Sequence, residues 1–352
     1  MKASAFRSQT VVALLALPCV GVACHKDKPA DVDLAAPASG RVSIDGSSTV
    51  MPLSKAVAAG FRAVNPAVNV DVAESGTGGG FRKFCAGQTD IEDASRPINA
   101  TEAATCKGRG VEFVELPVGF DSLSVVVNPK NTFANCLTVA ELKTMWEPAA
   151  EGKVKSWKQI RASFPDRPLK LFGPGHDSGT FDYFALAIVG VESKSRNDYT
   201  GSEDDTVLER GIAGDADAVG YFGYAYYQAN KDKLKLVGVD SGHGCVLPSA
   251  QTVADATYQP LSRPLFIYVS QAAAKRPEVA EFVRFYLKPE SASFVKGIGY
   301  VPLSATAMVT AAARFEKGKP GSVLGGHGSV LNVKLNAFDD EDEDRIRALL
   351  VQ

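Results

Sequence analysis

The chain has 352 residues, 45% of them hydrophobic, with 38 Lys and Arg residues against 40 Asp and Glu residues. This hydrophobic fraction excludes an intrinsically disordered chain, and the length favours two domains that are each large enough for a core. The formal net charge of −2 provides no overall attraction to nucleic acid or to an anionic membrane surface. Apolar stretches beyond the N-terminus are short and interrupted, so we expect no later transmembrane helix.

The N-terminus has the features of an export signal. Lys2 and Arg7 are positively charged, and a short apolar run follows at residues 11–17. A run of this length is too short to span a bilayer and is typical of a cleaved secretory signal. We therefore predict a signal peptide at residues 1–23 and a protein that works outside the cytoplasm, in the periplasm or the cell envelope.

Cys24 is a candidate for lipidation. Small residues stand directly before it, as in a bacterial lipobox, although Gly21 occupies a position where such motifs usually carry Leu. Lipidation would anchor the protein to the membrane, whereas ordinary cleavage nearby would leave a soluble exported protein. Residues 24–40 are rich in Ala, Pro and Asp and predict a flexible tether.

Hydrophobic periodicity predicts alternating helices and strands after the tether. Apolar residues at 53, 57, 61 and 64 share one face of a helix, and valines alternate with polar residues at 68–72, which indicates a strand. We expect further strands at residues 111–115, 123–127, 169–172, 218–222 and 234–237, and helices at 139–146, 181–189 and 278–287. This alternation favours an α/β fold with helices on both faces of mostly parallel sheets.

The C-terminal segment, residues 317–352, has a different composition. Glycines are frequent at residues 318–328, and six acidic residues follow one another at 339–344. Because a run of like charges is usually solvated, we expect a frayed tail and assign it no function.

Four cysteines follow the tether: Cys85, Cys106, Cys136 and Cys245. An even number in an oxidising compartment predicts two disulfides, for which three pairings exist. Cys85 and Cys106 are close in sequence, whereas a bond between Cys136 and Cys245 would close a much longer loop. A zinc site is the alternative, but the chain contains no CxxC spacing, so we predict disulfides and no metal.

Three short polar turns carry the functional prediction. They lie at residues 45–49, 74–80 and 173–180, and each has the form of a strand, a turn of small residues and a helix N-terminus. The first turn of a helix offers unpaired backbone N–H groups, and Ser or Thr hydroxyls add further donors. Three such turns around one point would coordinate a tetrahedral oxyanion.

Each turn alone has a simpler interpretation. A Ser or Thr before a helix is usually an N-cap, and glycine clusters usually serve turn geometry. No turn matches GxxxxGK[ST], so a nucleotide-binding P-loop is disfavoured. Two turns lie in the first half of the chain and one in the second, which is the arrangement expected if two lobes close on a ligand.

Seven segments together resemble one protein family. They are GSSTVMPLSKAVAAGF, ESGTGGGFRKFCAGQTDIEDASRPI, ELPVGFDSLSVVVNPKN, LFGPGHDSGTFDYF, SEDDTVLERGIAGDADAVGYFGYAYY, PLSRPLFIYV and GIGYVPL. Over about residues 42–315, the chain resembles the periplasmic phosphate-binding proteins of bacterial phosphate ABC importers, in particular the branch that includes cyanobacterial phosphate-binding lipoproteins.

The resemblance implies a two-lobed α/β solute-binding fold of type II with two hinge crossovers. Lobe I would comprise residues 41–125 and 264–316, and lobe II residues 126–263. The expected hinge strands are residues 123–127 and 265–269.

The resemblance also assigns a phosphate site. Motif by motif, the expected contacts are Ser48, Thr49, Ser75, Thr77, Arg96, Ser178, Gly179 and Thr180. Ser75 has capping as its alternative role.

Arg96 marks a departure from the best-known members of the family, which carry an acidic residue at that position and an arginine where this chain has Pro174. We therefore expect Arg96 to bind the oxyanion through both of its terminal nitrogens, with a surface salt bridge as the alternative. Glu74, Asp177 and Asp182 are candidates to replace the missing acid, which would accept the proton of monohydrogen phosphate and repel sulfate.

The resemblance implies a monomeric binding protein that takes up inorganic phosphate and docks on an ABC permease in the inner membrane, with no cofactor, no nucleic acid partner and no enzymatic activity. A binder of sulfate, molybdate or arsenate is the first alternative. A phosphate-ester hydrolase would need Ser178 as nucleophile with His176 or His243 as base, and the chain lacks a GxSxG motif. An adhesion or signalling module on the same scaffold is a third alternative.

Overall fold

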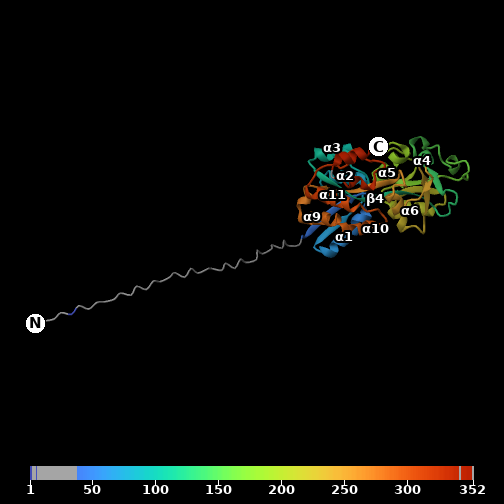
Figure 1. Ribbon diagram of the computed structural model, residues 1–352. Coiled ribbons are helices and arrows are strands. Elements are labelled where there is room, and N and C mark those ends of the chain that lie inside the picture. The colour runs from blue at the N-terminus through green and yellow to red at the C-terminus, as the bar shows by residue number, and fades with distance from the viewer. Residues whose placement is uncertain (2–4, 6–37, 341, 351–352) are drawn as a thin grey trace. The chain divides into compact units, whose positions relative to one another are not determined.

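A computed structural model describes residues 1, 5, 38–340 and 342–350 (Figure 1). The predicted signal peptide, Cys24 and most of the tether lie outside these described residues. Within them, no helix combines the length and the apolar character that crossing a membrane requires.

A sheet forms the centre of the fold, with eleven strands among the described residues. Its main path has the order β2-β1-β3-β11-β4-β8-β6-β7, and β9 pairs with β4, β5 and β10. The strands are β1 (Gly40–Gly46), β2 (Val68–Val72), β3 (Ile91–Ala94), β4 (Phe113–Val127), β5 (Cys136–Thr138), β6 (Lys170–Pro174), β7 (Thr200–Ser202), β8 (Ala218–Gly223), β9 (Lys235–Asp240), β10 (Cys245–Val246) and β11 (Ser262–Ser270).

Helices lie in both parts of the molecule that β4 connects (Figure 1). They are α1 (Met51–Val64), α2 (Gly76–Phe84), α3 (Ala100–Gly108), α4 (Val139–Trp146), α5 (Gly179–Phe184), α6 (Asp205–Gly214), α7 (Tyr224–Ala229), α8 (Ala250–Ala254), α9 (Pro277–Tyr286), α10 (Ala292–Ile298), α11 (Ala305–Glu316) and α12 (Glu343–Leu350). We call the part built on β1–β3, α1–α3 and α9–α11 lobe I, and the part built on β5–β10 and α4–α8 lobe II.

Strands β4 and β11 connect the two lobes. Residues 113–122 of β4 pair with β11, and residues 123–127 pair with β8 and β9. The sequence predicted two separate strands here, at residues 111–115 and 123–127, but β4 runs continuously through Pro117 and Gly119. A β-bulge accommodates them: Pro117 lies opposite Phe266 and Gly119 opposite Leu265, which leaves Val118 as the extra residue.

The sheet is mixed rather than mostly parallel. Strand β1 pairs in parallel with β2 and β3, and β6 with β7 and β8, but β11 and β4 run antiparallel to their neighbours. The predicted hinge segments 123–127 and 265–269 fall inside β4 and β11, and the lobe boundaries that we assigned from the sequence stay a prediction.

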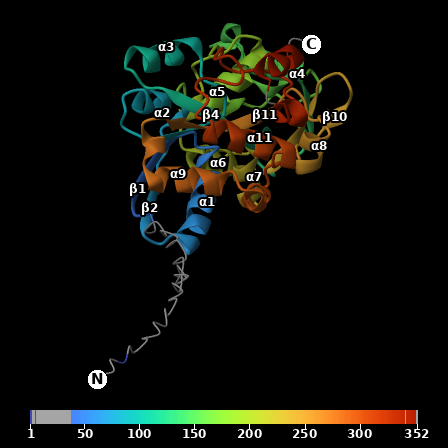
Figure 2. The same cartoon turned by 60° about the vertical axis from the view of Figure 1, so that its left-hand side comes forward.

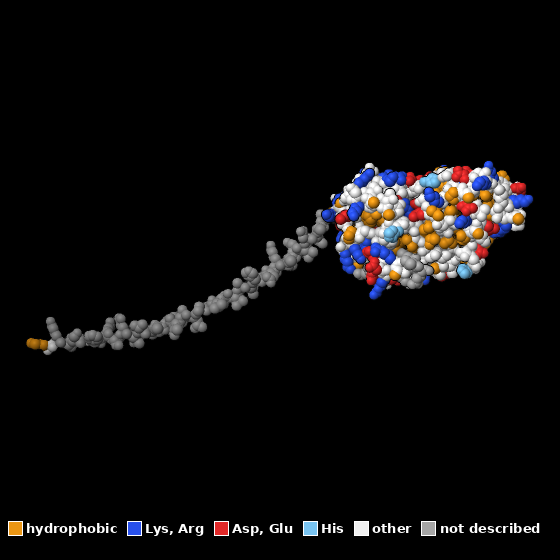
Figure 3. Space-filling model, turned by 90° about the horizontal axis from the view of Figure 1, so that it is seen from above, with side chains coloured by type: hydrophobic (Ala, Val, Ile, Leu, Met, Phe, Trp, Pro, Cys, Tyr) orange, Lys and Arg blue, Asp and Glu red, His pale blue; other side chains and the backbone are white. Residues whose placement is uncertain are grey.

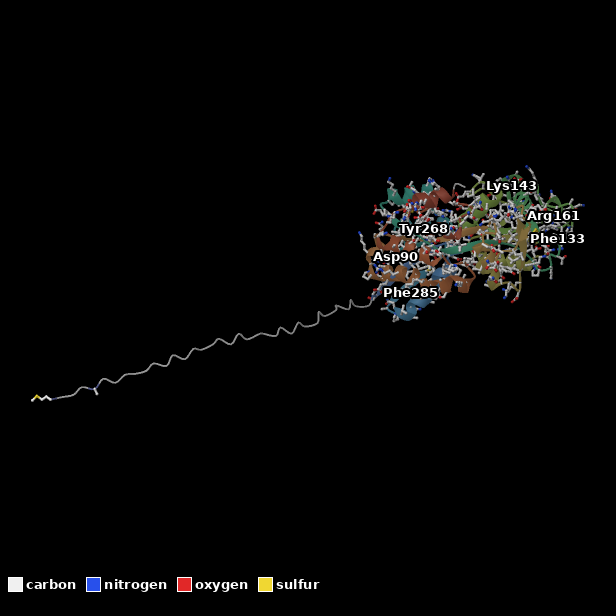
Figure 4. The ribbon with its side chains drawn as sticks, in the orientation of Figure 1. Asp90, Phe133, Lys143, Arg161, Tyr268 and Phe285 are labelled. Carbon is white, nitrogen blue, oxygen red and sulfur yellow. A yellow bond between two sulfur atoms is a disulfide. The ribbon has the colours of Figure 1, made fainter. Side chains whose placement is uncertain are left out.

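Each lobe has an aromatic core. In lobe I, the ring of Phe81 meets that of Tyr268 edge-on with 4.8 Å between centroids, and in lobe II Phe133 meets Trp157 in the same manner at 5.2 Å. Figure 4 labels Tyr268 and Phe133. Such rings remove large apolar areas from water. On the face seen in Figure 3, acidic and basic side chains lie intermixed, in agreement with the small net charge.

The expectation of a frayed C-terminal tail is wrong for the described residues. Val323, Phe338 and Ile346 are buried in the same apolar cluster as residues of β4 and α11. Arg314 of α11 is also buried, and its Nη1 donates to Glu343, one of the six successive acids. The acidic run therefore supplies a counter-charge to a buried arginine, and the apolar residues around it pack against β4 and α11. In Figure 2 the red, C-terminal end of the chain is folded against the rest of the protein.

The prediction of two disulfides is confirmed, and the structure selects one of the three pairings. Cys85 bonds to Cys106 and joins the end of α2 to α3, and Cys136 bonds to Cys245 and joins β5 to β10. Within the described part of the chain, no group of three or more His, Cys, Asp or Glu residues could hold a metal ion.

The two disulfides should differ in their contribution to stability. The Cys136–Cys245 bond spans 109 residues and the Cys85–Cys106 bond spans 21. In the chain-entropy treatment, this difference corresponds to about 1.5 kcal/mol in favour of the longer loop. We expect the Cys136→Ala/Cys245→Ala double variant to lose more free energy of unfolding than Cys85→Ala/Cys106→Ala, as measured by urea denaturation. Equal losses would contradict this expectation.

Candidate anion-binding site

The first turn presents two hydroxyls that do not cap a helix. Ser48 and Thr49 are buried between β1 and α1, and the N-cap of α1 is Val50, which makes no side-chain cap. Gly46 has a φ of 138°, and a Cβ there would lie 2.2 Å from the backbone oxygen of Asp93. Glycine is required for this close approach to β3. The N-cap interpretation therefore does not account for Ser48 and Thr49.

The two hydroxyl residues of the second turn have different partners. Thr77 is fully buried at the start of α2, with its Oγ1 3.2 Å from Ser95 Oγ and the backbone N–H of Ser95 donating to it. The hydroxyl of Ser75 instead donates to Asp45 at 2.6 Å. The structure thus separates the two residues that the sequence had assigned to one site.

The third turn meets the other two. Ser178 is the N-cap of α5 and accepts from the backbone N–H of Thr180. The hydroxyls of Thr180 and Thr49 lie 3.2 Å apart, although they come from different lobes. A Cβ on Gly179 would lie 2.6 Å from Thr77 Oγ1, so the third turn also approaches the second. The three turns therefore lie around one buried point.

Arg263 of β11 lies at the same point. Its side chain is fully buried, and its Nη2 donates to Thr180 Oγ1 at 2.7 Å and to Thr49 Oγ1 and Asp121 Oδ2 at 3.1 Å. Its Nη1 donates to the backbone oxygen of Gly179 at 3.1 Å. Its Nε has no hydrogen-bond partner among the described residues. The cluster of Thr49, Thr180 and Arg263 thus combines neutral donors with one positive charge.

Sequence reasoning missed Arg263. The residue lies within PLSRPLFIYV, a segment that entered only as part of the family resemblance and as a hinge strand. The available signal was an arginine inside an otherwise apolar strand, because a fully buried arginine needs a charged or polar partner.

Two carboxylates lie beside the cluster. Asp121 pairs with Arg263, and Asp205, at the first position of α6, accepts from Ser48 Oγ at 3.2 Å. Burial raises the pKa of Asp121 to about 6 and the pKa of Asp205 to about 8.

Two of the three acids proposed from the sequence are paired with arginines. Asp177 and Asp182 form ion pairs with Arg82 and Arg96, respectively. Glu74 is half-buried, and burial raises its pKa.

Arg96 also has a different environment from the one expected. Its Nε donates to Asp182 at 2.6 Å, and its Nη1 and Nη2 donate to the two oxygens of Glu102 at 2.8 and 2.7 Å. The guanidinium nitrogens of Arg96, which the sequence predicts to bind an oxyanion, therefore donate to two carboxylates of the protein itself. The alternative of a salt bridge agrees with these contacts, but the arginine is buried rather than on the surface, with a side chain that is 3% exposed.

Ser178 and His176, two of the groups named in the hydrolase alternative, make other contacts in the structure. Ser178 Oγ accepts from a backbone N–H, and the ring of His176 packs against Phe181 with 4.6 Å between centroids. The described contacts thus place Ser178 in a capping interaction and His176 in an aromatic one.

The fold and the buried polar cluster between two lobes define a solute-binding protein, and comparison with known proteins agrees. Residues 31–290 match a model described as a PBP superfamily domain. Protein SphX of Synechocystis sp. is 50% identical over 295 residues, which cover 84% of this chain and 87% of SphX. The phosphate-binding protein PstS of Staphylococcus haemolyticus is 34% identical over 264 residues, which cover 74% of this chain and 81% of PstS.

Solved structures extend the comparison. One described as a "possible phosphate binding protein" from Planctomyces limnophilus has a TM-score of 0.59 at 45% identity and covers 80% of this chain and 99% of its own. A structure described as a "Putative Phosphate ABC Transporter Substrate-Binding Protein with Bound Phosphate" from Clostridium perfringens has a TM-score of 0.64 and the same fold at 24% identity, over 75% of this chain and 100% of its own. This chain belongs to the PBP superfamily and, within it, to the family that includes SphX and PstS.

Two further acids lie under the first turn and should make stability depend on pH. Glu92 and Asp93 of β3 are fully buried, and Ser54 Oγ donates to Asp93 Oδ1 at 2.8 Å. Burial raises the pKa of Asp93 to about 8 and that of Glu92 well above its ordinary value. The folded protein therefore keeps a proton on Asp93 that the unfolded chain loses above a pH of about 4, and stability falls as the pH rises from there to about 8.

We expect Asp93→Asn to reduce the fall in melting temperature between pH 5 and pH 8, because the amide does not titrate. Thermal unfolding followed by circular dichroism at several pH values tests this. Asp71→Asn, on the surface strand β2, serves as the control and should keep the wild-type slope. An unchanged slope in Asp93→Asn would show that Asp93 does not carry the proton.

Proposed function

We propose that this protein binds inorganic phosphate outside the cytoplasm and delivers it to an ABC importer. Relatives at 33–34% identity are named phosphate-binding proteins, and a solved relative at 45% identity is described in similar words. The observation that carries the proposal is the convergence of Thr49, Thr180 and Arg263, which come from different elements and are all buried at one point between the lobes.

The cluster has the chemistry that a tetrahedral oxyanion requires. Arg263 Nη2 faces three acceptors, and the two threonine hydroxyls bond to each other and to the guanidinium. An anion at this point would accept from all three side chains in place of their mutual bonds. Buried donors that are already oriented bind an anion well, because little reorganisation is needed.

The proposed contacts are revised from those expected from the sequence. We retain Ser48, Thr49, Thr77, Ser178, Gly179 and Thr180 and add Arg263. Ser75 and Arg96 support the site from outside, since their side chains bond to Asp45 and to Asp182 with Glu102, respectively.

Asp205 is our candidate for the residue that accepts the proton of monohydrogen phosphate. It is fully buried and bonded to Ser48, whereas Asp177 and Asp182 are occupied by arginines. Sulfate has no proton to share with such a carboxylate. Where Asp205 is ionised, which its pKa of about 8 places at a pH above that value, charge repulsion would oppose sulfate, and the site would favour phosphate over the other oxyanions.

The cellular setting belongs to the same proposal. Relatives of this family are solute-binding proteins, and we infer export, with Cys24 as a lipid anchor, a monomeric state and docking on a permease in the inner membrane. Among the described residues, no feature calls for a metal ion. Turnover of p-nitrophenyl phosphate would separate a hydrolase from a binding protein.

Replacing Arg263 tests the proposed site. We expect Arg263→Lys to weaken phosphate binding at least tenfold by calorimetry, because lysine keeps the charge but loses the planar donors that reach Thr49, Thr180 and Gly179. The matched control is Arg284→Lys, since Arg284 forms a two-point ion pair with Glu316 on the surface of lobe I. A folded Arg263→Lys protein with wild-type affinity would remove Arg263 from the site.

Replacing Asp205 tests selectivity. We expect Asp205→Asn to bind phosphate less tightly and to lose at least tenfold in its preference for phosphate over sulfate, because the amide carries no negative charge and can present an N–H donor to sulfate. Competition calorimetry at about pH 9, where a carboxyl with a pKa of about 8 is mostly ionised, measures both affinities. Asp215→Asn, which replaces a surface partner of Lys170 in lobe II, should leave the ratio unchanged. If the ratio in Asp205→Asn equalled that of the wild type, another group would set the selectivity.

A further inference from the structure

Two arginines of lobe I contact carboxylates of lobe II on either side of the third turn. Arg82 of α2 donates from Nη1 and Nη2 to the two oxygens of Asp177 at 2.7 and 2.6 Å. Arg96, after β3, donates from Nε to Asp182 at 2.6 Å. Asp177 directly precedes Ser178, and Asp182 follows Thr180 by two residues. The two ion pairs therefore enclose the segment that carries Ser178, Gly179 and Thr180.

The geometry points to a latch: we propose that Arg82–Asp177 and Arg96–Asp182 hold the lobes closed and slow the release of the bound anion. The inference rests on the proposed function for its ligand, but it concerns residues that do not contact the anion in that proposal. Arg82 and Arg96 act as positioning residues.

The buried ion pair of the latch, Arg96–Asp182, has its arginine already positioned within lobe I. Glu102 holds the Nη1 and Nη2 atoms of Arg96, and Glu102 itself belongs to the capping box of α3 with Asn99. These contacts lie within lobe I and do not depend on lobe II. Among the hydrogen bonds of Arg96 to described residues, the bond from Nε to Asp182 is the one that crosses between the lobes. Opening of the lobes would therefore break this bond and leave Arg96 bonded to Glu102.

A backbone hydrogen bond reinforces the exposed ion pair of the latch, Arg82–Asp177. The backbone N–H of Gly78, in α2, donates to the backbone oxygen of Asp177 at 2.8 Å. A Cβ on Gly76 would lie 2.5 Å from that same oxygen, and Gly76 has a φ of 73°, so a side chain there would obstruct the approach. The glycine-rich start of α2 thus allows lobe I to reach the turn that Arg82 engages.

The two ion pairs should differ in strength and in how far salt screens them. The side chains of Arg82 and Asp177 are 65% and 42% exposed, whereas those of Arg96 and Asp182 are 3% and 7% exposed. An exposed ion pair contributes about 1 kcal/mol or less and is screened by salt. A buried pair is desolvated, so removing one partner leaves an uncompensated charge. Contacts made only in the closed form act mainly on the rate of dissociation.

The test measures release of radiolabelled inorganic phosphate, chased with unlabelled phosphate, from the full exported chain. We expect Arg82→Asp and Asp177→Arg to release phosphate about five times faster than the wild type, as expected when an exposed pair of about 1 kcal/mol is lost. The double variant Arg82→Asp/Asp177→Arg should restore slow release. Asp182→Asn should also release faster. Arg284→Asp, which breaks a surface pair within lobe I, should not.

Wild-type release rates in all of these variants, or a double variant as fast as the single ones, would overturn the latch. Small-angle X-ray scattering supplies a readout that needs no bound phosphate. Without added anion, the latch predicts a larger radius of gyration for Asp182→Asn than for the wild type, and equal radii would also overturn it. Failure of the wild type to bind phosphate in calorimetry would contradict the proposed function alone, and scattering would still decide the latch.

Discussion

The structure depends on a charged guanidinium that is buried between the two lobes. Arg263 is fully buried on β11, one of the two strands that connect the lobes. Removing a charge from water is expensive unless it is paired and hydrogen-bonded. Asp121, from β4, pairs with Arg263, and Thr49 and Thr180 add hydroxyl acceptors from lobe I and lobe II. The connecting strands therefore position the charge, and the two lobes complete its surroundings.

This arrangement explains why the site is spread so widely along the sequence. Each of the three turns supplies donors only at a strand-to-helix junction, and none surrounds an anion alone. The pairing of β4 with β11 brings Asp121 and Arg263 together, and lobe closure then adds Thr49 and Thr180. The latch that we infer uses the same logic, because Arg82 and Arg96 act on the third turn from the opposite lobe.

Local patterns in the sequence predicted much of this architecture. The helix expected at residues 139–146 is α4, and the glycine and hydroxyl turns were recognised because their chemistry lies within a few residues. Long-range effects were not accessible in the same way. The continuity of β4 depends on a bulge opposite β11, and the burial of Val323, Phe338 and Ile346 depends on a surface formed by distant elements. A charge run alone could not indicate that Glu343 faces a buried arginine.

The roles of the two arginines show the same limit. The sequence motif assigned Arg96 to the anion, but Arg96 donates to Glu102 and Asp182. Arg263 lies outside the three turns and was not selected from the sequence, although it lies at the centre of the buried cluster with Thr49 and Thr180. A crystal structure of the protein with phosphate tests this assignment most directly. The account predicts phosphate oxygens within about 2.7–3.2 Å of the Arg263 guanidinium and of the Thr49 and Thr180 hydroxyls, with Arg96 still on its carboxylates. Phosphate held by Arg96, or bound away from Arg263, would contradict it.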